Sequence, residues 1–327
     1  MKKAVQLLLK ALSSPETRLD VQKSRRLMNL KLIDPFRPFY RTLDVGISCG
    51  GKEIPVRIYF PGEEVYDAVD VDQVLKEAGG SGGSVKSGEI CGPVILYFHG
   101  GGFVTESVES YNRVCWNLAR HTGQTVISVD YPLAPEHRFP EPFDACYAVA
   151  KALYTDRSVF HVNPEDLTIM GDSAGGNLAA AVCQKARDTG DFSPRRQILV
   201  YPCVNNNYEE NNGFASVMEN GDEYLLTRRN MEDYLEYYQG SKEDRENPYF
   251  APLMASDFSM LPRALVITGE FDPLRDEGEE YAKRMREAGV EVTARRIKDG
   301  VHGFFLLEPL YPAVREVYQL VNEFLNS

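Results

Sequence analysis

The chain has 327 residues, of which 43% are hydrophobic and 26% charged, a composition typical of a globular protein with a large buried core. Its formal net charge of −12 repels nucleic-acid phosphates and anionic lipid headgroups, so neither nucleic acid nor a membrane surface is an expected partner. No apolar run approaches the ~20 residues that a membrane-spanning helix requires.

The N-terminal segment, residues 1–40, is expected to be helical, with breaks at its prolines. Its start resembles a signal peptide only weakly. The apolar core is too short, Lys10 interrupts it, and no clear small-x-small cleavage site follows. We therefore interpret the start of the chain as an amphipathic helix and expect a cytoplasmic protein.

The six cysteines are scattered, with no Cys-x-x-Cys pair and no histidine at metal-ligand spacing. They are Cys49, Cys91, Cys115, Cys146, Cys183 and Cys203. Several of them lie in apolar helical contexts, where cysteine is usually a small buried hydrophobic residue. Free structural thiols are therefore expected, rather than disulfides or a metal site.

A β-hairpin is expected next, because Asp44–Cys49 and Ile54–Phe60 are rich in β-branched and aromatic residues and are separated by two glycines. Residues 61–92 differ in character. They contain a Gly-Gly-Ser-Gly-Gly-Ser run and one short helical stretch, Val71–Ala78. We interpret them as a flexible surface insertion without an assigned function.

From Pro93 onwards strands and helices alternate, which predicts a mainly parallel sheet with helices on both faces. The expected strands are Val94–Phe98, Thr125–Asp130, Leu167–Met170, Gln197–Tyr201, Ala264–Thr268 and Val290–Ile297. The expected helices are Val108–Thr122, Pro142–Thr155, Ala174–Thr189, Asp276–Ala288 and Tyr311–Phe324. No Gly-x-Gly-x-x-Gly follows a strand, so a dinucleotide site is not supported.

The alternation is interrupted by an acidic, aromatic and mostly helical stretch after the strand at 197–201. We therefore expect an α/β core in two parts, residues 41–204 and 246–327, separated by an insertion at 205–245. This insertion and residues 1–40 are expected to pack together as a helical cap. Sheets of this type bind ligands beyond the carboxyl ends of their strands, so such a cap would enclose a pocket there.

The sequence Gly-Asp-Ser-Ala-Gly-Gly at 171–176 stands between an expected strand and an expected helix. Small residues two positions before and after Ser173 allow a tight reversal that leaves the hydroxyl exposed, as a nucleophile requires. The pentapeptide alone fits an ordinary turn equally well. The flanking strand and helix favour a nucleophile at Ser173.

A second glycine-rich motif, His99-Gly100-Gly101-Gly102-Phe103, directly follows the strand at 94–98. By itself it fits a simple turn as well as a functional loop. In the same sheet as Ser173, however, its backbone N–H groups are candidates to stabilise an oxyanion. Gly101 and Gly102 are the expected donors, together with Ala174, the residue after the nucleophile.

Of the five histidines, His302 is the expected base, because it follows the strand ending near 297 and so lies at the carboxyl end of the sheet. The orienting acid is expected at Asp272, just past the strand at 264–268. Glu270 is a rival for that role. Asp276 is better placed as an acid at the start of a helix.

These motifs resemble those of the hormone-sensitive-lipase-like carboxylesterases of the α/β-hydrolase superfamily, in which nucleophile, acid and histidine follow in this order. Three further signatures carry the resemblance: Asp130–His137, Asp272–Gly278 and His302–Phe304. The resemblance covers about residues 40–60 and 93–326. It implies an eight-stranded, mostly parallel sheet flanked by helices, with a helical cap.

Two departures from the family pattern stand out. Pro132 occupies a position where the family usually has arginine, which removes a contact that braces the loop. The stretch at 61–92 is longer than is typical, so it either reaches the mouth of the site or extends into solvent. Neither departure removes a residue with an expected catalytic role.

The resemblance implies a serine carboxylesterase that hydrolyses short-acyl esters of small molecules, acetyl to butyryl, through a Ser-His-Asp triad and an acyl-enzyme. It implies no metal and no cofactor. Phe103, Phe214, Tyr224 and Leu225 are candidates to line the substrate pocket, with packing in the cap as the equal alternative. Family members often dimerise through the last strand of the sheet, so a homodimer is one expected arrangement.

Three other functions remain open at this point. An amidase or deacetylase would use the same groups. A small-molecule receptor on the same fold typically lacks the histidine, which is present here as His302. The acidic surface and the absence of a long apolar lid favour short-acyl substrates over those of a true lipase.

Overall fold

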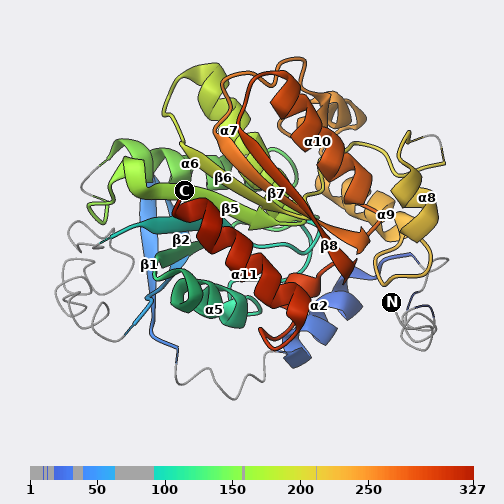
Figure 1. Cartoon of the computed structure of the whole chain (residues 1–327), viewed down its shortest axis with the longest axis horizontal. Helices are drawn as coiled ribbons and strands as arrows, with labels where there is room; N and C mark the ends of the chain where they lie inside the picture. Colours follow the sequence, from blue (N-terminus) through green and yellow to red (C-terminus); the bar gives the residue numbers. More distant parts are fainter. Residues whose placement is uncertain are drawn as a thin grey trace.

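The computed structural model describes residues 10, 13, 18–31, 40–62, 92–156, 159–210 and 212–327. Most of the expected insertion at 61–92 and much of the expected N-terminal helix therefore lie outside the described residues. The described strands form one eight-stranded sheet in the order β1-β2-β4-β3-β5-β6-β7-β8 (Figure 1). Their bounds are β1 Thr42–Cys49, β2 Lys52–Tyr59, β3 Val94–Phe98, β4 Thr125–Val129, β5 Leu167–Asp172, β6 Arg196–Val200, β7 Arg263–Phe271 and β8 Val292–Val301.

Most neighbouring strands are parallel. The predicted hairpin is present, with β1 antiparallel to β2, and β2 is also antiparallel to β4. The remaining pairs, from β4 through β3, β5, β6 and β7 to β8, are all parallel. Every residue of β3, β4 and β5 is buried, as is typical of central strands with both faces covered.

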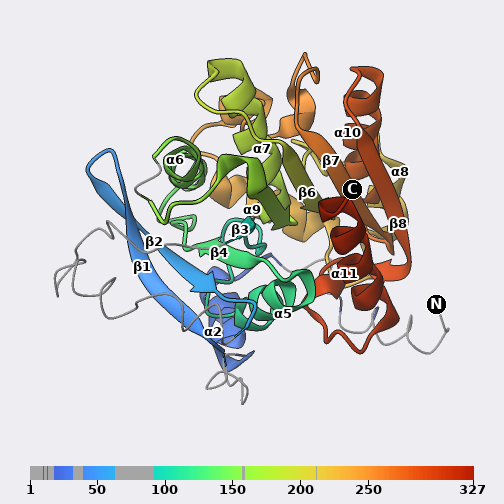
Figure 2. The same cartoon turned by 60° about the vertical axis from the view of Figure 1, so that its left-hand side comes forward.

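Helices cover both faces of the sheet (Figure 2). Their bounds are α2 Val21–Lys31, α5 Asn112–Thr122, α6 Glu141–Thr155, α7 Ala174–Thr189, α8 Ala215–Asn220, α9 Arg228–Tyr238, α10 Arg275–Glu287 and α11 Pro312–Leu325. One core contains side chains of α6, α7 and α10, such as Cys146, Val182 and Met285. The core on the other face contains side chains of α5 and α11, such as Cys115 and Val317. The α/β-hydrolase architecture expected from the sequence is confirmed.

Two element boundaries differ from the sequence prediction. The helix expected from Val108 begins at Asn112, because Ser107 and Ser110 bond each other's backbone N–H and form a turn before it. Strand β8 does not end near Ile297 but continues to Val301. A register shift between Gly269 and Phe271 accompanies this extension, and it places His302 directly after the strand.

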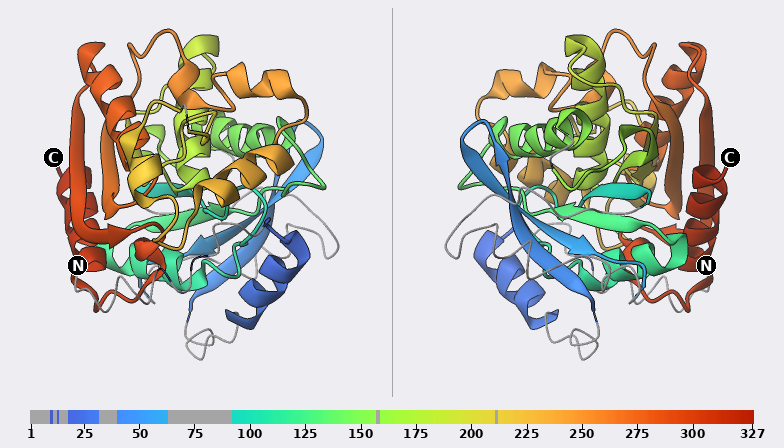
Figure 3. Two further views of the ribbon diagram at one scale, coloured as in Figure 1. Left: turned by 90° about the vertical axis from the view of Figure 1, so that its right-hand side faces the viewer. Right: turned by 90° about the vertical axis from the view of Figure 1, so that its left-hand side faces the viewer.

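The N-terminal segment packs against the insertion between β6 and β7 (Figure 3). The guanidinium of Arg18 bonds Glu236 of α9 at 2.9 Å, and the N–H of Leu19 donates to Asp233 at 2.7 Å. The hydroxyl of Tyr237 donates to the carbonyl of Leu19. These contacts join two parts of the expected cap. Its boundaries at residues 40, 205 and 245 stay predictions.

No described helix has both the length and the apolar composition required to cross a membrane.

Candidate active site

Ser173 lies at a sharp turn between β5 and α7. Its backbone has φ 53° and ψ −121°, a region that a residue with a side chain adopts at a cost of about 1–3 kcal/mol. The glycines around it are required by close packing. A Cβ atom on Gly171 would lie 2.1 Å from the carbonyl oxygen of Gly175, and one on Gly175 would lie 1.9 Å from that of Phe98. The motif therefore folds as the tight strand-to-helix turn that the sequence predicts.

The carboxylate of Asp172, next to Ser173, ties this turn to the glycine-rich loop. It accepts hydrogen bonds from the hydroxyls of Tyr97 and Tyr111, at 2.7 and 2.8 Å, and from the N–H of Gly100 at 3.0 Å. Burial raises the pKa of Asp172 to about 6, although these hydrogen bonds favour its charged form. Asp172 thus fixes the loop relative to Ser173.

The structure brings Ser173, His302 and Asp272 together in one hydrogen-bonded chain. The Nε2 atom of His302 lies 2.9 Å from the hydroxyl of Ser173, and its Nδ1 atom lies 2.9 Å from Oδ2 of Asp272. Asp272 is fully buried, and its other oxygen accepts the N–H of Leu274 at 2.8 Å. A serine hydroxyl held in this way can transfer its proton to the imidazole as it attacks an electrophile.

Glu270, the rival for the acid position, has a different partner. Its Oε2 atom accepts the N–H of Asp299 at 2.8 Å, so it braces the end of β8. Asp276 lies in the first turn of α10, as expected, where its carboxylate pairs with Arg275 at 2.7 Å. Of the three acidic groups in this turn, Asp272 is the one bonded to His302.

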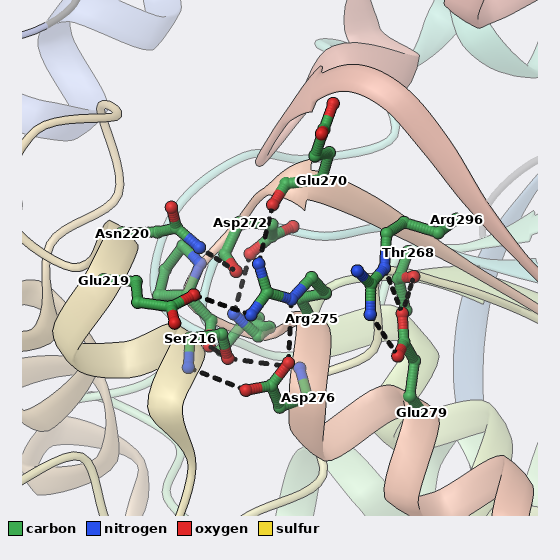
Figure 4. A network of polar contacts seen from close by, with 12 residues as sticks. Ser216, Glu219, Asn220, Thr268, Glu270, Asp272, Arg275, Asp276, Glu279 and Arg296 are labelled. Carbon is green, nitrogen blue, oxygen red and sulfur yellow. Dashed lines mark hydrogen bonds and ion pairs between the residues drawn. The ribbon is translucent and has the colours of Figure 1, made fainter.

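Helix α8 of the cap is fastened to the turn that carries Asp272 (Figure 4). The hydroxyl of Ser216 donates to the carbonyl of Pro273 at 2.8 Å and accepts the N–H of Asp276 at 3.1 Å. The side-chain amide of Asn220 donates to the carbonyl of Asp272 at 3.3 Å. The cap therefore contacts the backbone of the acid and of the residues that follow it.

The expected oxyanion donors and Ser173 line the same cavity. Gly101 and Gly102 have φ values of 110° and 61°, which favour glycine. A Cβ atom on Gly102 would lie 2.4 Å from the ring of Tyr234, which packs over the loop from α9. Ala174 is the first residue of α7, so its N–H has no acceptor within the helix.

Arg25 of α2 braces the glycine-rich loop. Its guanidinium donates to the carbonyls of Val104 and Ala134, each at 2.8 Å, and to both carboxylate oxygens of Glu136. The hydrogen bond from Arg25 also lowers the pKa of Glu136. A guanidinium therefore does reach this loop, although Pro132 stands where the family has arginine. No local motif around Arg25 signals this role.

His99 is buried within the loop and positions it. Its Nδ1 atom lies 2.8 Å from the carbonyl oxygen of Gly100, and its ring stacks on Tyr131 with centroids 4.3 Å apart. Burial lowers the pKa of His99 to about 4, so the ring is neutral at physiological pH. His99 therefore helps to hold the glycine-rich loop in place.

The cavity above Ser173 has a volume of about 140 Å³. Its lining consists of Gly101, Gly102, Phe103, Glu106, Tyr111, Asp172, Ser173, Ala174, Tyr201, Cys203, Leu226, Met231, Tyr234, Leu235, His302, Gly303 and Leu306. The cap supplies an apolar wall from α9, whose Met231, Tyr234 and Leu235 follow helical spacing. The positions i, i+3 and i+4 of these three residues lie on one helix face, and this pattern in the sequence could have identified them as cavity-lining residues.

Of the four pocket residues proposed from the sequence, only Phe103 lines the cavity. The other three do not belong to its lining. Phe214 lines a separate hollow over β7, β8 and α10. Tyr224 stacks on Phe271 with ring centroids 5.1 Å apart, and Leu225 is 42% exposed. The insertion turns these three side chains away from Ser173.

Among the described residues, no group of three or more histidine, cysteine, aspartate and glutamate side chains is arranged to hold a metal ion. The five cysteines in this part of the chain, Cys49, Cys115, Cys146, Cys183 and Cys203, are free thiols. Cys91 lies outside the described residues.

A family model described as the alpha/beta hydrolase fold matches residues 95–306. An ethyl acetate hydrolase of Pseudomonas putida is 30% identical over 97% of this chain and 91% of its own length. An arylesterase of Saccharolobus solfataricus is 31% identical over 88% of this chain and 85% of its own length.

Solved structures of esterases are similar over nearly the whole chain. An esterase of Pyrobaculum calidifontis superposes with a TM-score of 0.82 at 33% identity, covering 99% of this chain and 98% of that one. A fungal esterase of Rhizomucor miehei superposes with a TM-score of 0.84 at 31% identity, covering 100% of this chain and 96% of that one.

Proposed function

This chain belongs to the hormone-sensitive-lipase-like carboxylesterases of the α/β-hydrolase fold and is a carboxylic ester hydrolase, and on that premise we propose that it hydrolyses short-acyl esters with Ser173 as its nucleophile. The observation that carries the proposal is the continuous chain from Ser173 through His302 to Asp272, with both contacts at 2.9 Å. Such a chain supplies the nucleophile, its base and the group that orients the base.

In the proposed mechanism, the hydroxyl of Ser173 attacks the ester carbonyl while Nε2 of His302 takes its proton. Asp272 holds the imidazole in the tautomer that leaves Nε2 free to accept, and it stabilises the imidazolium. His302 then protonates the departing alcohol. Water, activated by the same histidine, releases the acid from the acyl-enzyme.

We propose that the N–H groups of Gly101, Gly102 and Ala174 stabilise the oxyanion of the tetrahedral intermediate. Their place in the lining beside Ser173 supports this assignment. Removing one donor of this kind from a serine hydrolase typically lowers turnover by about 10²–10³. In this chain, the close contact of Gly102 with Tyr234 means that a side chain at 102 would also move the loop.

Two observations support a short acyl group. The cavity of about 140 Å³ is closed on one side by the apolar residues of α9. One relative is an ethyl acetate hydrolase. A short acyl chain fills such a cavity, whereas a long one would have to displace cap side chains that are packed against the core, such as Met231 and Leu235.

A chain-length series of p-nitrophenyl esters tests this proposal. The acetate and butyrate should give a higher kcat/KM than the decanoate or palmitate, and Ser173→Ala should remove the activity. Ser48→Ala, at an exposed serine of β1, is the matched control and should retain it. A preference for long acyl chains would contradict the proposed acyl limit, and turnover by Ser173→Ala would contradict the assignment of the nucleophile.

A parallel assay with p-nitroacetanilide separates an esterase from an amidase. An esterase should hydrolyse p-nitrophenyl acetate much faster than this anilide, whereas an amidase should hydrolyse the anilide at a comparable rate.

We also propose that the protein acts in the cytoplasm, because the five described cysteines are free thiols, as is usual in a reducing compartment. A homodimer through β8, the last strand of the sheet, is proposed by analogy with the family. Light scattering of the purified protein would test the oligomeric state directly.

A further inference from the structure

Glu106 is an unusual member of the cavity lining. It follows the glycine-rich loop and has a φ of 65°, a left-handed conformation that is costly for a residue with a side chain. Most of the lining is glycine, aromatic or aliphatic. The chain therefore holds a carboxylate at the reaction site in spite of a backbone conformation that favours glycine.

The other carboxylate in the lining, that of Asp172, already has hydrogen-bond partners within the protein. Asp172 accepts from Tyr97, Tyr111 and the N–H of Gly100, so its oxygens have protein partners. Glu106, in contrast, makes no hydrogen bond or ion pair with any residue in the described ranges 18–31, 40–62, 92–156, 159–210 and 212–327. It is half-buried. Its charge is therefore available to a bound molecule.

The lining contains no lysine or arginine among the described residues. The guanidinium of Arg25, which braces the glycine-rich loop, bonds Val104, Ala134 and Glu136 instead. No lysine or arginine in the described lining thus offsets the charge of Glu106. Partial burial also weakens solvent screening, so this charge acts more strongly on a ligand than one on the open surface would.

We propose that Glu106 makes this site selective for esters that carry a cationic group, such as a substituted ammonium, over neutral or anionic esters of the same shape. The inference rests on the proposed function and specifies its substrate class. The ring of Tyr234, which packs over Gly102 in the same lining, offers an aromatic face to such a cation. A carboxylate and an aromatic ring together are a typical binding site for a quaternary ammonium ion.

The test compares ester pairs that differ only in charge. Acetylcholine and 3,3-dimethylbutyl acetate place the charge, or its carbon isostere, in the alcohol. The p-nitrophenyl esters of 4-(trimethylammonio)butyrate and 5,5-dimethylhexanoate place it in the acyl group. For each pair the measured quantity is the ratio of kcat/KM for the cationic ester to that for the neutral one. This ratio cancels any general effect of a substitution on the loop.

We expect Glu106→Gln, which keeps the shape and removes the charge, to lower this ratio about tenfold in at least one pair at low ionic strength. Added salt should reduce the ratio of the wild type. Glu210→Gln removes the same charge from an exposed position of the cap and should leave both ratios unchanged. Should Glu106→Gln fold poorly, Glu106→Gly suits the φ of 65° and should show the same loss of cation preference.

Ratios that stay within twofold of the wild type in both pairs would overturn the inference. That result is distinct from failure of the proposed function. If the proposed function were wrong, the wild type would not hydrolyse the neutral esters, or Ser173→Ala would still hydrolyse them.

Discussion

The carboxyl end of the sheet and the cap hold their residues in place by different means. At the sheet end, Ser173 stands at a tight strand-to-helix turn, and the carboxylate of Asp272 accepts the N–H of Leu274, two residues further on. The cap is attached through side chains that join distant segments, such as Arg18 with Glu236 and Arg25 with Glu136. The chemistry of the protein is therefore encoded locally, whereas the shape and charge of its pocket depend on long-range contacts.

The largest effect is expected at the sheet end, from Asp272→Asn. The asparagine amide would favour the wrong tautomer of His302, so kcat should fall by about 10⁴, as it does after the corresponding substitution in a known Ser-His-Asp triad. Glu270→Gln is the matched control in the same turn. It should reduce kcat by less than threefold, because Glu270 bonds Asp299 rather than His302. Steady-state kinetics with p-nitrophenyl butyrate measure kcat of both variants. Equal losses of kcat would mean that Asp272 has been wrongly assigned as the acid.

A smaller effect is expected where the cap supports the site, from Arg25→Met. The variant keeps the volume of the side chain but loses its bonds to the carbonyls of Val104 and Ala134. We expect kcat to fall about tenfold, because about 1.4 kcal/mol of transition-state stabilisation is lost when the loop donors are less well positioned. Arg26→Met, at the exposed neighbouring position of α2, should behave like the wild type. Equal kinetics in all three proteins would show that the loop needs no support from α2.

The junction between sheet and cap should respond to pH through Glu277. Burial raises the pKa of Glu277 to about 8, although the N–H groups of Val204 and Asn205 and the hydroxyl of Tyr208 bond its carboxylate. Between the ordinary glutamate pKa and about 8, the folded protein keeps a proton that the unfolded chain releases. Relative to Glu277→Gln, the wild type should therefore lose stability as pH rises through this window.

The size of this effect is at most about 1.4 kcal/mol per pH unit. Urea unfolding of both proteins at pH 5, 6, 7 and 8 measures it. The stability of the wild type minus that of Glu277→Gln should fall as pH rises. A value that stays constant or rises with pH would contradict the buried, neutral state of Glu277.

The smallest effect is expected from Ser216→Ala, which removes hydrogen bonds between α8 and the turn that follows Asp272. The variant leaves the carbonyl of Pro273 and the N–H of Asp276 without their hydroxyl partner. The free energy of unfolding should fall by about 1 kcal/mol, as for a typical buried hydrogen bond. Met218→Ala, at an exposed position of the same helix, should change it little. Urea unfolding at pH 7 compares the two, and equal stabilities would mean that the hydroxyl is dispensable.

The contrast between the two regions explains what could be predicted from the sequence. The parallel sheet and the meeting of Ser173, Asp272 and His302 follow from motifs placed directly after strands, where the direction of the chain determines where a side chain lies. The boundaries that differed, at Asn112 and Val301, depend on a side-chain turn and on a bulge in β7–β8. Neither leaves a periodic signal in the sequence.

The sequence predicted that the cap is helical, but it could not predict which side chains of the cap line the cavity. Tyr234 and Leu225 are both large hydrophobic or aromatic residues of the insertion, yet Tyr234 lines the cavity whereas Leu225 is 42% exposed. Tyr234 reaches the cavity because α9 packs over the glycine-rich loop, and tertiary contacts determine that packing. Arg25 and Glu106 escaped prediction for the same reason.

Covalent labelling tests the central claim most directly, that Ser173 is the nucleophile oriented by His302 and Asp272. The wild type should react with p-nitrophenyl diethyl phosphate, lose activity in step with one covalent modification per chain, and carry that modification on the peptide that contains Ser173. Mass spectrometry of a proteolytic digest locates the label. A label at any other residue, accompanied by the same loss of activity, would contradict the account.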